Sequence, residues 1–312
     1  SFIGSELRDP LSFDYLGDLI RENSDHLLIR TGIVLVIAGI AFKIGAAPFQ
    51  IWVPDVYHGS PMPITAFLSV SSKAAGFFVL LNLVNGPFAG ANDFILPLLG
   101  FVATFTIFFG NLAACAQRNL KRMLGLSGVA HAGYLLVAIM ASMHFPGDSD
   151  RAVWVLFFYM FVYLVASFVV FGVMSLADVE DDNEHEFSDY EGLAQKNPLL
   201  GFALVCGIGS LAGIPPFAGF IGKLLLISVA LEAELYFSLG AMIVGVVISI
   251  FYYFGWIREI AFHPRPVFND DKPKHDAWTK LKDIAMIKFV LIILTFVSLV
   301  FGIWQGPFGD TF

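Results

Sequence analysis

Charged residues are scarce in this sequence, and that scarcity excludes an ordinary soluble domain. Only 14% of the 312 positions are Asp, Glu, Lys or Arg, whereas 57% are hydrophobic and the mean hydropathy is +0.76. This composition indicates an integral membrane protein. The formal net charge of −8 comes mostly from loops, above all from the acidic stretch Asp178 to Gly192. We therefore expect no nucleic-acid partner, because such a partner would need basic patches.

The motifs of common catalytic and metal sites are also lacking. The sequence has no HExxH, no CxxC and no GxSxG with triad partners. Its two cysteines, Cys115 and Cys206, both fall inside apolar runs, where cysteine packs as a small apolar residue. Flavin, haem and Fe–S ligation have no support either. We expect this chain to bind no metal and no cofactor of its own.

Strict alternation of apolar and polar residues, the pattern of membrane β-strands, is lacking as well. The sequence instead contains apolar runs of about 20 residues, the length that crosses a hydrocarbon core of ~30 Å. We therefore predict an all-α polytopic membrane protein with about eight transmembrane helices. The expected spans are 31–50, 61–84, 93–115, 121–142, 151–177, 199–231, 235–261 and 284–304.

Two of these spans contain helix-breaking residues. GAAPF (Gly45 to Phe49) and GIPPF (Gly213 to Phe217) share a Gly-x-x-Pro-Phe pattern. Proline removes a backbone donor and glycine lets the chain unwind, so we predict discontinuous helices at 31–50 and 199–231. Transporters built from repeats place broken helices at corresponding positions, where freed backbone groups line a polar cavity. The predicted breaks lie at Pro48 and at Gly213, Pro215 and Pro216.

Ionisable residues deep inside the spans are the main functional signal. An ionised lysine at mid-bilayer costs at least ~2.5 kcal/mol, so an unexplained one is rarely kept. Lys43 and Lys73 lie at matching depth, ~18 Å into neighbouring antiparallel spans. Lys223 follows the Pro-Pro break, and His131 lies in the fourth span among small residues. Desolvation disfavours the ammonium form, so we predict that these four groups, linked by water, form a proton pathway.

The positive residues at span ends predict the orientation. They gather between the third and fourth spans and between the seventh and eighth, and the positive-inside rule places both loops in the cytoplasm. Both ends of the chain would then lie outside, although three arginines within the first 30 residues favour the opposite orientation mildly. Long cationic side chains at span ends usually snorkel to the headgroups, and we assign that role to Lys121, Arg122 and Lys288.

Three stretches of the sequence point to a family. They are FKIGAAPFQIWVPDVYHGSPMPITAFLSVSSKAAGF (Phe42 to Phe77), NLAACAQRNLKRMLGLSGVAHAGYLLVA (Asn111 to Ala138) and SLAGIPPFAGFIGKLLL (Ser210 to Leu226). They closely resemble the proton-translocating, antiporter-like membrane subunits of respiratory complex I, NADH:quinone oxidoreductase, which are related to Mrp antiporter subunits. The resemblance covers nearly everything from Leu27 to Trp304.

The resemblance implies a fold of fourteen helices with two inverted five-helix repeats, of which this chain would supply family helices seven to fourteen. The start, SFIGSELRDP, has neither a methionine nor a signal-peptide pattern and is typical of a piece of something longer. The implied parts are an extracytoplasmic polar segment (1–30), the remainder of the first half-channel repeat (31–84), the second five-helix half-channel repeat (93–261), a cytoplasmic loop (262–283) and the C-terminal transmembrane helix (284–304).

The resemblance also implies a role for each buried ionisable group. Lys43 resembles the lysine of the first half-channel, whose charge the family tunes with a glutamate on its fifth helix. That helix would come from a preceding segment or from a second polypeptide. Lys73 resembles the lysine of the following helix, His131 the central histidine, and Lys223 the lysine of the exit half-channel. We further expect the dipole of the half-helix that carries Lys223 to disfavour its charged form and so to help it release a proton.

The implied function is proton translocation coupled to NADH oxidation and quinone reduction elsewhere in a large complex. NADH, FMN, Fe–S clusters and quinone would be bound by partner subunits, and the partners of this chain would be other membrane subunits of the complex and lipids. The implied location is an energy-transducing membrane, the inner membrane of a bacterial cell. Two alternatives stay open: an Mrp-type cation/proton antiporter subunit, and a structural membrane module whose lysines tolerate methionine.

Overall fold

The structure, a computed structural model, describes residues 12–144, 150–176, 185–262 and 285–303. Within these ranges the chain is helical with short connections, and its β-structure is limited to one isolated bridge between Asn119 and Glu186. The predicted all-α class is therefore confirmed. The expected cytoplasmic loop at 262–283 lies, but for its first residue, outside the described residues.

The long helices are α2 (Leu27–Ile44), α6 (Asn92–Cys115), α7 (Leu120–His144), α8 (Asp150–Met174), α12 (Tyr236–Phe262) and α13 (Ala285–Ile303). One further span is composite and consists of α4 (Met62–Phe67), the π-helical turn η1 (Leu68–Ser72) and α5 (Lys73–Asn85). The shorter helices are α1 (Phe13–Glu22), α3 (Trp52–Gly59), α9 (Leu193–Lys196), α10 (Pro198–Ala212) and α11 (Ala218–Glu232). Two 3₁₀ turns, η2 (Ala89–Ala91) and η3 (Phe187–Tyr190), complete the described elements.

Seven of the described helices are long and apolar enough to cross a membrane, with α4 to α5 taken as one. The eighth expected span, 199–231, consists of α10 and α11, two helices of 15 residues each, with the break between them. The first expected span is also discontinuous, because α2 ends at Ile44 and the chain resumes a helix only at Trp52. Its second half-helix, α3, lies beyond the expected end at residue 50, since a proline, an aspartate and a histidine make α3 less apolar.

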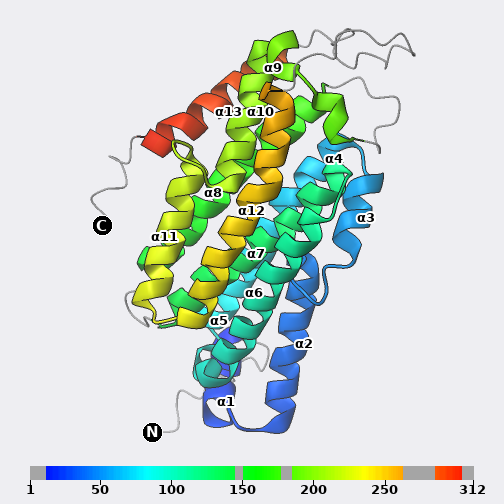
Figure 1. The fold of residues 1–312 in the computed structure, drawn as a ribbon. Coiled ribbons are helices and arrows are strands. Elements are labelled where there is room, and N and C mark those ends of the chain that lie inside the picture. Colours follow the sequence, from blue (N-terminus) through cyan, green and yellow to red (C-terminus); the bar gives the residue numbers. More distant parts are fainter. Residues whose placement is uncertain (1–11, 145–149, 177–184, 263–284, 304–312) are drawn as a thin grey trace, which may run out of the picture.

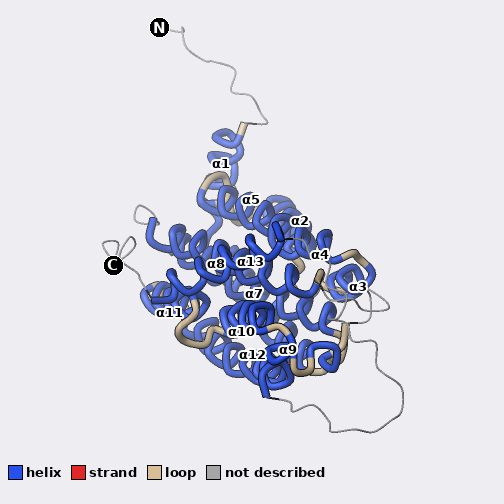
Figure 2. The backbone as a smooth tube through the Cα atoms, turned by 90° about the horizontal axis from the view of Figure 1, so that it is seen from above, coloured by secondary structure: helices blue, strands red, loops and turns tan. Residues whose placement is uncertain are grey.

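Helix α7 is the centre of the bundle. It lies in the middle of the helices in both views, packed against α3, α5, α6, α8, α11 and α12 (Figures 1 and 2). All of its most apolar 18-residue window is buried, compared with 17% for α13, which lies obliquely across α8 and α10 at the outside. Groups carried by α7 are therefore remote from lipid on every side.

Small residues allow α6 to lie close against α7. A methyl group added at Gly110 would come within 2.5 Å of the backbone nitrogen of Ala130, and one added at Gly133 within 2.6 Å of Ile107. Membrane helices gain little from the hydrophobic effect against one another, so their association depends on such close packing. This contact holds α7, and the side chains on it, at a fixed depth in the bundle.

Candidate functional site

Lys73 lies at the end of the π-helical turn η1, in a buried position. Its side chain is 3% exposed, and its Nζ donates a hydrogen bond to the backbone carbonyl of Gly128 on α7 at 2.7 Å. The π-turn widens the helix by one residue and so changes the direction in which Lys73 leaves it; such turns are frequent at functional sites. A methyl group added at Gly128 would be 2.8 Å from this Nζ, so a larger residue here would displace the end of the Lys73 side chain.

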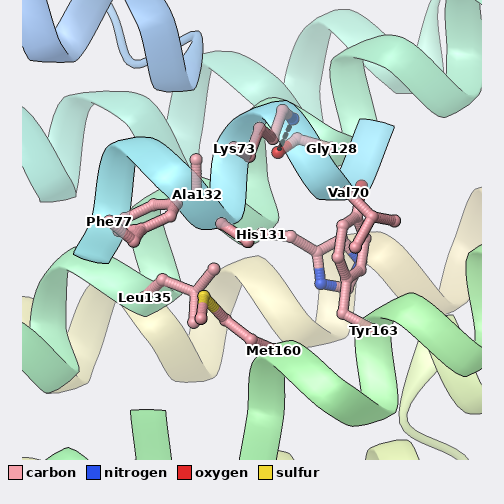
Figure 3. Close-up of a pocket in the computed structure, with 10 residues that line it drawn as sticks. Val70, Lys73, Phe77, Gly128, His131, Ala132, Leu135, Met160 and Tyr163 are labelled. Carbon is pink, nitrogen blue, oxygen red and sulfur yellow. Dashed lines mark hydrogen bonds between the residues drawn. The ribbon is translucent and has the colours of Figure 1, made fainter. Parts of the chain in front are cut away.

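Lys73 and His131 share a small cavity. The cavity has a volume of about 10 Å³, and its other lining residues include Gly128 and Tyr163 (Figure 3). The walls of this cavity are almost entirely apolar, so it brings the two side chains next to each other without a polar lining for a resident water.

His131 lies near the middle of α7, among three tyrosines. Its Nδ1 is hydrogen-bonded to the hydroxyl of Tyr159 at 2.7 Å. Its ring centroid is 4.7 Å from that of Tyr163, and the edge of Tyr134 is turned toward it with centroids 5.8 Å apart. This surrounding fixes the ring and leaves its second nitrogen to exchange a proton.

Lys223 lies on α11, and its ammonium occupies the end of α10. The side chain is 3% exposed, and Nζ donates to the carbonyls of Leu211 at 2.9 Å and Ala212 at 2.7 Å. These are the carbonyls that the break leaves without helical partners, at the negative end of the α10 dipole. The expectation that the dipole of α11 disfavours the charged form of Lys223 was wrong, because Lys223 is the sixth residue of α11. The dipole end near its ammonium is the negative end of α10, which stabilises the charged form.

Tyr134 links the His131 site to the Lys223 site. The Lys223 Nζ is 5.7 Å from the centre of the Tyr134 ring, a cation–π geometry, and the centre of the His131 ring is 5.8 Å from that same centre. The hydroxyl of Tyr134 accepts a hydrogen bond from Asn111 at 3.2 Å, and Asn111 in turn accepts one from Tyr252. Lys73 of α5 and Lys223 of α11 therefore lie beside the same stretch of α7 that carries His131.

Lys43 does not share this buried environment. Its side chain is exposed on α2, at the edge of the bundle, and its Nζ makes one long contact of 3.5 Å with the hydroxyl of Ser72. Because Ser72 directly precedes Lys73, the two lysines lie at similar depth. No described helix covers the face of α2 that carries Lys43, so the expected role of Lys43 in the pathway stays a prediction.

Both helix breaks begin with a glycine in the left-handed conformation. Gly45 has φ 72° and Gly213 has φ 78°, and each ends the preceding helix. Residues with a Cβ disfavour this conformation by about 1–2 kcal/mol, which explains why both patterns start with glycine. The prolines that follow, Pro48, Pro215 and Pro216, lie in the turns and are exposed.

Lys121 is buried, contrary to the snorkelling assigned from the sequence. It is 0% exposed, and its Nζ donates to the carbonyl of Ser60 at 2.7 Å. The position at the start of α7 is covered by the end of α3, which residue counting to the span end cannot reveal. Arg122 does reach the surface, where it pairs with Asp55 of α3 at 2.6 Å.

A known family matches most of this chain. The sequence model of the family described as NADH:quinone oxidoreductase/Mrp antiporter, TM, matches residues 5–249. The chain belongs to this family. The resemblance found in the sequence is thereby confirmed, and the chain is an antiporter-family membrane protein with several spans.

Two curated relatives of the antiporter family carry the same designation. NADH-quinone oxidoreductase subunit N 1 of Opitutus terrae is 50% identical over 301 residues, which are 96% of this chain and 58% of that protein. NADH-quinone oxidoreductase subunit N of Desulforamulus reducens is 35% identical over 298 residues, which are 95% of this chain and 59% of that protein. The chain thus spans somewhat more than half the length of these relatives.

Solved structures of the antiporter family share the fold. A chain of respiratory complex I from Thermus thermophilus with bound aureothin has a TM-score of 0.73 at 29% identity, covering 94% of this chain and 64% of that one. A chain of the membrane-bound sulfane sulfur reductase, an archaeal respiratory membrane complex, has a TM-score of 0.79 at 24% identity, covering 96% and 57%. The second likeness concerns the fold alone.

Several polar residues in the core of this antiporter-family chain escaped the sequence analysis. They are hydroxyl and amide side chains on α6, α7, α8 and α12 that either contact a buried lysine or the histidine or take part in neighbouring hydrogen bonds and cavity walls. Tyrosine usually lies at the membrane interface, so a tyrosine at mid-span was the one available signal. No group of metal-ligating side chains occurs within the described ranges. The residues that were missed are Asn111, Ser127, Tyr134, Tyr159, Tyr163, Ser167, Ser249, Tyr252 and Tyr253.

Proposed function

We propose that this chain is part of a membrane-arm subunit of a proton-translocating NADH:quinone oxidoreductase and conducts protons through Lys73, His131 and Lys223. The observation that carries the proposal is the common cavity of Lys73 and His131, together with the placement of Lys223 beside the Tyr134 ring. Each of the three groups is buried, and each has a protein partner that holds its exchangeable proton in place. Burying three such groups in one membrane bundle is costly unless they serve transport.

The residues of this chain would pass the proton in steps. The Lys73 ammonium gives up a proton, which a water molecule between the two side chains carries to His131, and the neutral imidazole becomes charged. His131 then returns to its neutral form as this proton passes to the neutral amine of Lys223, whose ammonium is stabilised by the free carbonyls at the end of α10. Lys43 would load the pathway, since its Nζ reaches Ser72, next to Lys73.

Redox chemistry belongs to other subunits in this proposal. NADH, FMN, Fe–S clusters and quinone would be bound there, and the energy of electron transfer would shift the protonation of the buried groups here. The proposal assigns residues 31–84 to the first half-channel repeat and 93–261 to the second. It places the chain in the inner membrane of a bacterial cell, with both ends of the chain on the outer side. The relatives named as NADH-quinone oxidoreductase subunits support it.

The test is the replacement of Lys223 by methionine in the full-length protein within its assembled complex. Everted membrane vesicles would report NADH oxidation and NADH-driven proton uptake in the same sample. We expect Lys223→Met to lower proton uptake at least about tenfold, because a positioned proton carrier is lost. Lys288→Met, on the outer helix α13, is the matched control and should behave as wild type. Unchanged proton uptake in Lys223→Met with normal assembly would refute the proposal.

A second function is supported by the family description, which includes Mrp antiporters. A cation/proton antiporter subunit would use the same buried lysines to exchange protons for sodium. Sodium flux in proteoliposomes, in the absence of NADH, distinguishes the two: the antiporter requires it, and the NADH-driven pump does not.

A further inference from the structure

Tyr163 on α8 lies where its hydroxyl can receive a proton from the Lys73 ammonium by a route that does not include His131. A Cβ atom added to Gly128 would lie 2.8 Å from the Lys73 Nζ and 2.9 Å from the Tyr163 hydroxyl. The two atoms are therefore no more than about 6 Å apart, a gap that one water bridges with two hydrogen bonds. Tyr163 also lines the cavity that Lys73 and His131 share (Figure 3).

Tyr163 also lines a second cavity. Its volume is also about 10 Å³, and four of its lining residues carry hydroxyl groups. Ser167 lies one turn along α8 from Tyr163, and Ser127 is hydrogen-bonded to Tyr253. Tyr163 is the residue common to both cavities, so it connects the cavity beside Lys73 with a second, hydroxyl-lined cavity. The four residues are Ser127, Tyr163, Ser167 and Tyr253.

The second cavity leads to Lys223. Leu211, whose carbonyl accepts a hydrogen bond from the Lys223 Nζ, also lines this cavity. On α12, Ser249 lies one turn before Tyr253 and therefore on the same face. The Ser249 hydroxyl is 3.5 Å from the Lys223 Nζ. Hydroxyl groups are thus placed at both ends of the space between Tyr163 on α8 and the ammonium of Lys223 on α11.

The route from His131 to Lys223 has an aromatic ring beside it and not a row of hydroxyl groups. The hydrogen bond of His131 goes to Tyr159, and both His131 and Lys223 lie beside the ring of Tyr134. An aromatic face attracts a cation but does not itself relay a proton, so the branch through His131 needs a water molecule or a hydroxyl beside this ring. A hydroxyl, by contrast, both donates and accepts, and so can relay a proton.

We propose that the hydroxyls of Tyr163, Ser167, Tyr253 and Ser249 form a second proton branch between Lys73 and Lys223, parallel to the branch through His131. This inference rests on the proposed function. In each relay step a hydroxyl oxygen accepts one proton while its own proton passes to the next group, so every hydroxyl ends neutral. The net change is one proton lost by the Lys73 ammonium and one gained by the Lys223 amine, and only O–H and N–H bonds break and form.

The experiment is a double-mutant cycle of Tyr163→Phe and His131→Gln in the full-length protein, measured as NADH-driven proton uptake by everted vesicles. Tyr163→Phe removes the hydroxyl and keeps the ring that packs on His131. Tyr253→Phe is an independent cut of the same branch. Tyr236→Phe, an exposed tyrosine at the start of α12, is the matched control, and immunoblots of the solubilised complex confirm assembly.

We expect each single variant to retain part of the proton uptake and the double variant to fall at least about tenfold below either, because parallel branches compensate for each other. Tyr253→Phe combined with His131→Gln should give the same loss. A double variant no worse than His131→Gln alone overturns the branch while leaving the proposed function intact. Full proton uptake in Lys223→Met overturns both, because the branch ends at Lys223.

Discussion

The two broken helices of this chain start alike and are completed by different groups. After Gly45, the indole N–H of Trp52 donates to the carbonyl of Phe42 at 3.0 Å. After Gly213, the ammonium of Lys223 takes the corresponding place on the carbonyls at the end of α10. The first break is thus filled by a neutral group and the second by an ionisable one.

The backbone donors at the two breaks are satisfied by one common device. The N–H of Ala47 donates to the hydroxyl of Thr106 at 3.0 Å, and the N–H of Gly219 donates to the hydroxyl of Ser210 at 3.1 Å. Sequence similarity between the breaks therefore indicates similar backbone geometry. The ability to hold a proton depends on the side chain that reaches the freed carbonyls, and only the second break has a lysine there.

The breaks also differ in how tightly they are packed. Ile51, six residues after Gly45, is 76% exposed. Gly219, six residues after Gly213, lies so close to the Ser210 carbonyl that an added methyl group would overlap it. The second break is packed closely at Gly219, whereas the residue at the matching position of the first break is exposed in this chain.

The largest expected effect follows from this packing. Gly219→Ala should lower the free energy of unfolding by about 3 kcal/mol, because the new methyl group has backbone on the opposite side and nowhere to move. Ile51→Ala, at the matching position, should stay within about 0.5 kcal/mol of wild type. Steric-trapping measurements in bicelles give both values. Equal losses for the two variants would contradict the described difference in packing.

Substituting the glycines that have a left-handed φ should cause the next largest loss of stability. Gly45→Ala and Gly213→Ala should each cost about 1–2 kcal/mol of stability for the strained φ alone. Only Gly213→Ala should also reduce proton uptake, since its methyl group would lie 2.6 Å from the Lys223 side chain. Thermal unfolding in detergent and vesicle proton uptake check the two parts. If Gly45→Ala impaired uptake as strongly at equal assembly, the functional distinction between the breaks would fail.

The hydroxyl partners of the backbone should have smaller and similar effects. Thr106→Val and Ser210→Ala each leave a buried N–H without its acceptor, which should cost about 1–2 kcal/mol. Hydrogen exchange at Ala47 and Gly219, measured by mass spectrometry, should rise in the respective variant and not in the other. Faster exchange at both breaks from a single substitution would show that they do not act independently.

Trp52→Phe should have the smallest effect. It removes the indole donor from the Phe42 carbonyl at a half-buried site where water can replace it, so we expect a loss of about 0.5–1 kcal/mol. Proton uptake should be unchanged, because the first break holds no exchangeable group at its carbonyls. The check is vesicle uptake at matched subunit levels; a large drop in uptake would give the first break a transport role through Trp52.

Most of the fold could be predicted from the sequence because hydropathy and helix breakers are local signals. Apolar runs of membrane-spanning length identified the spans, and the Pro-Pro pair located the division between α10 and α11. The extent of the first broken helix was missed, since α3 carries Asp55 and His58 and is too polar to count as part of a span.

The candidate site was only partly predictable. Lys73, His131 and Lys223 stood out because charge is rare in apolar runs, and the structure brings them together along α7. Ser167 gave no such signal, and Tyr163 only the weak one of a tyrosine at mid-span, because the role of either hydroxyl depends on α7 and α12, which are distant in sequence. Lys121 was misjudged for a related reason, since its cover comes from Ser60 on another helix.

The burial of α7 has a consequence for how this protein is made. Its best window has a mean hydropathy of 1.7, against 2.6 for the outer helix α13, and it carries an imidazole at mid-span. A helix released alone into lipid by the insertion machinery would expose that imidazole to acyl chains, at a cost that neighbouring helices remove. We therefore expect α7 to be retained beside the translocon until α8 has emerged, which would make the α7–α8 hairpin, and not the single span, the unit of membrane insertion.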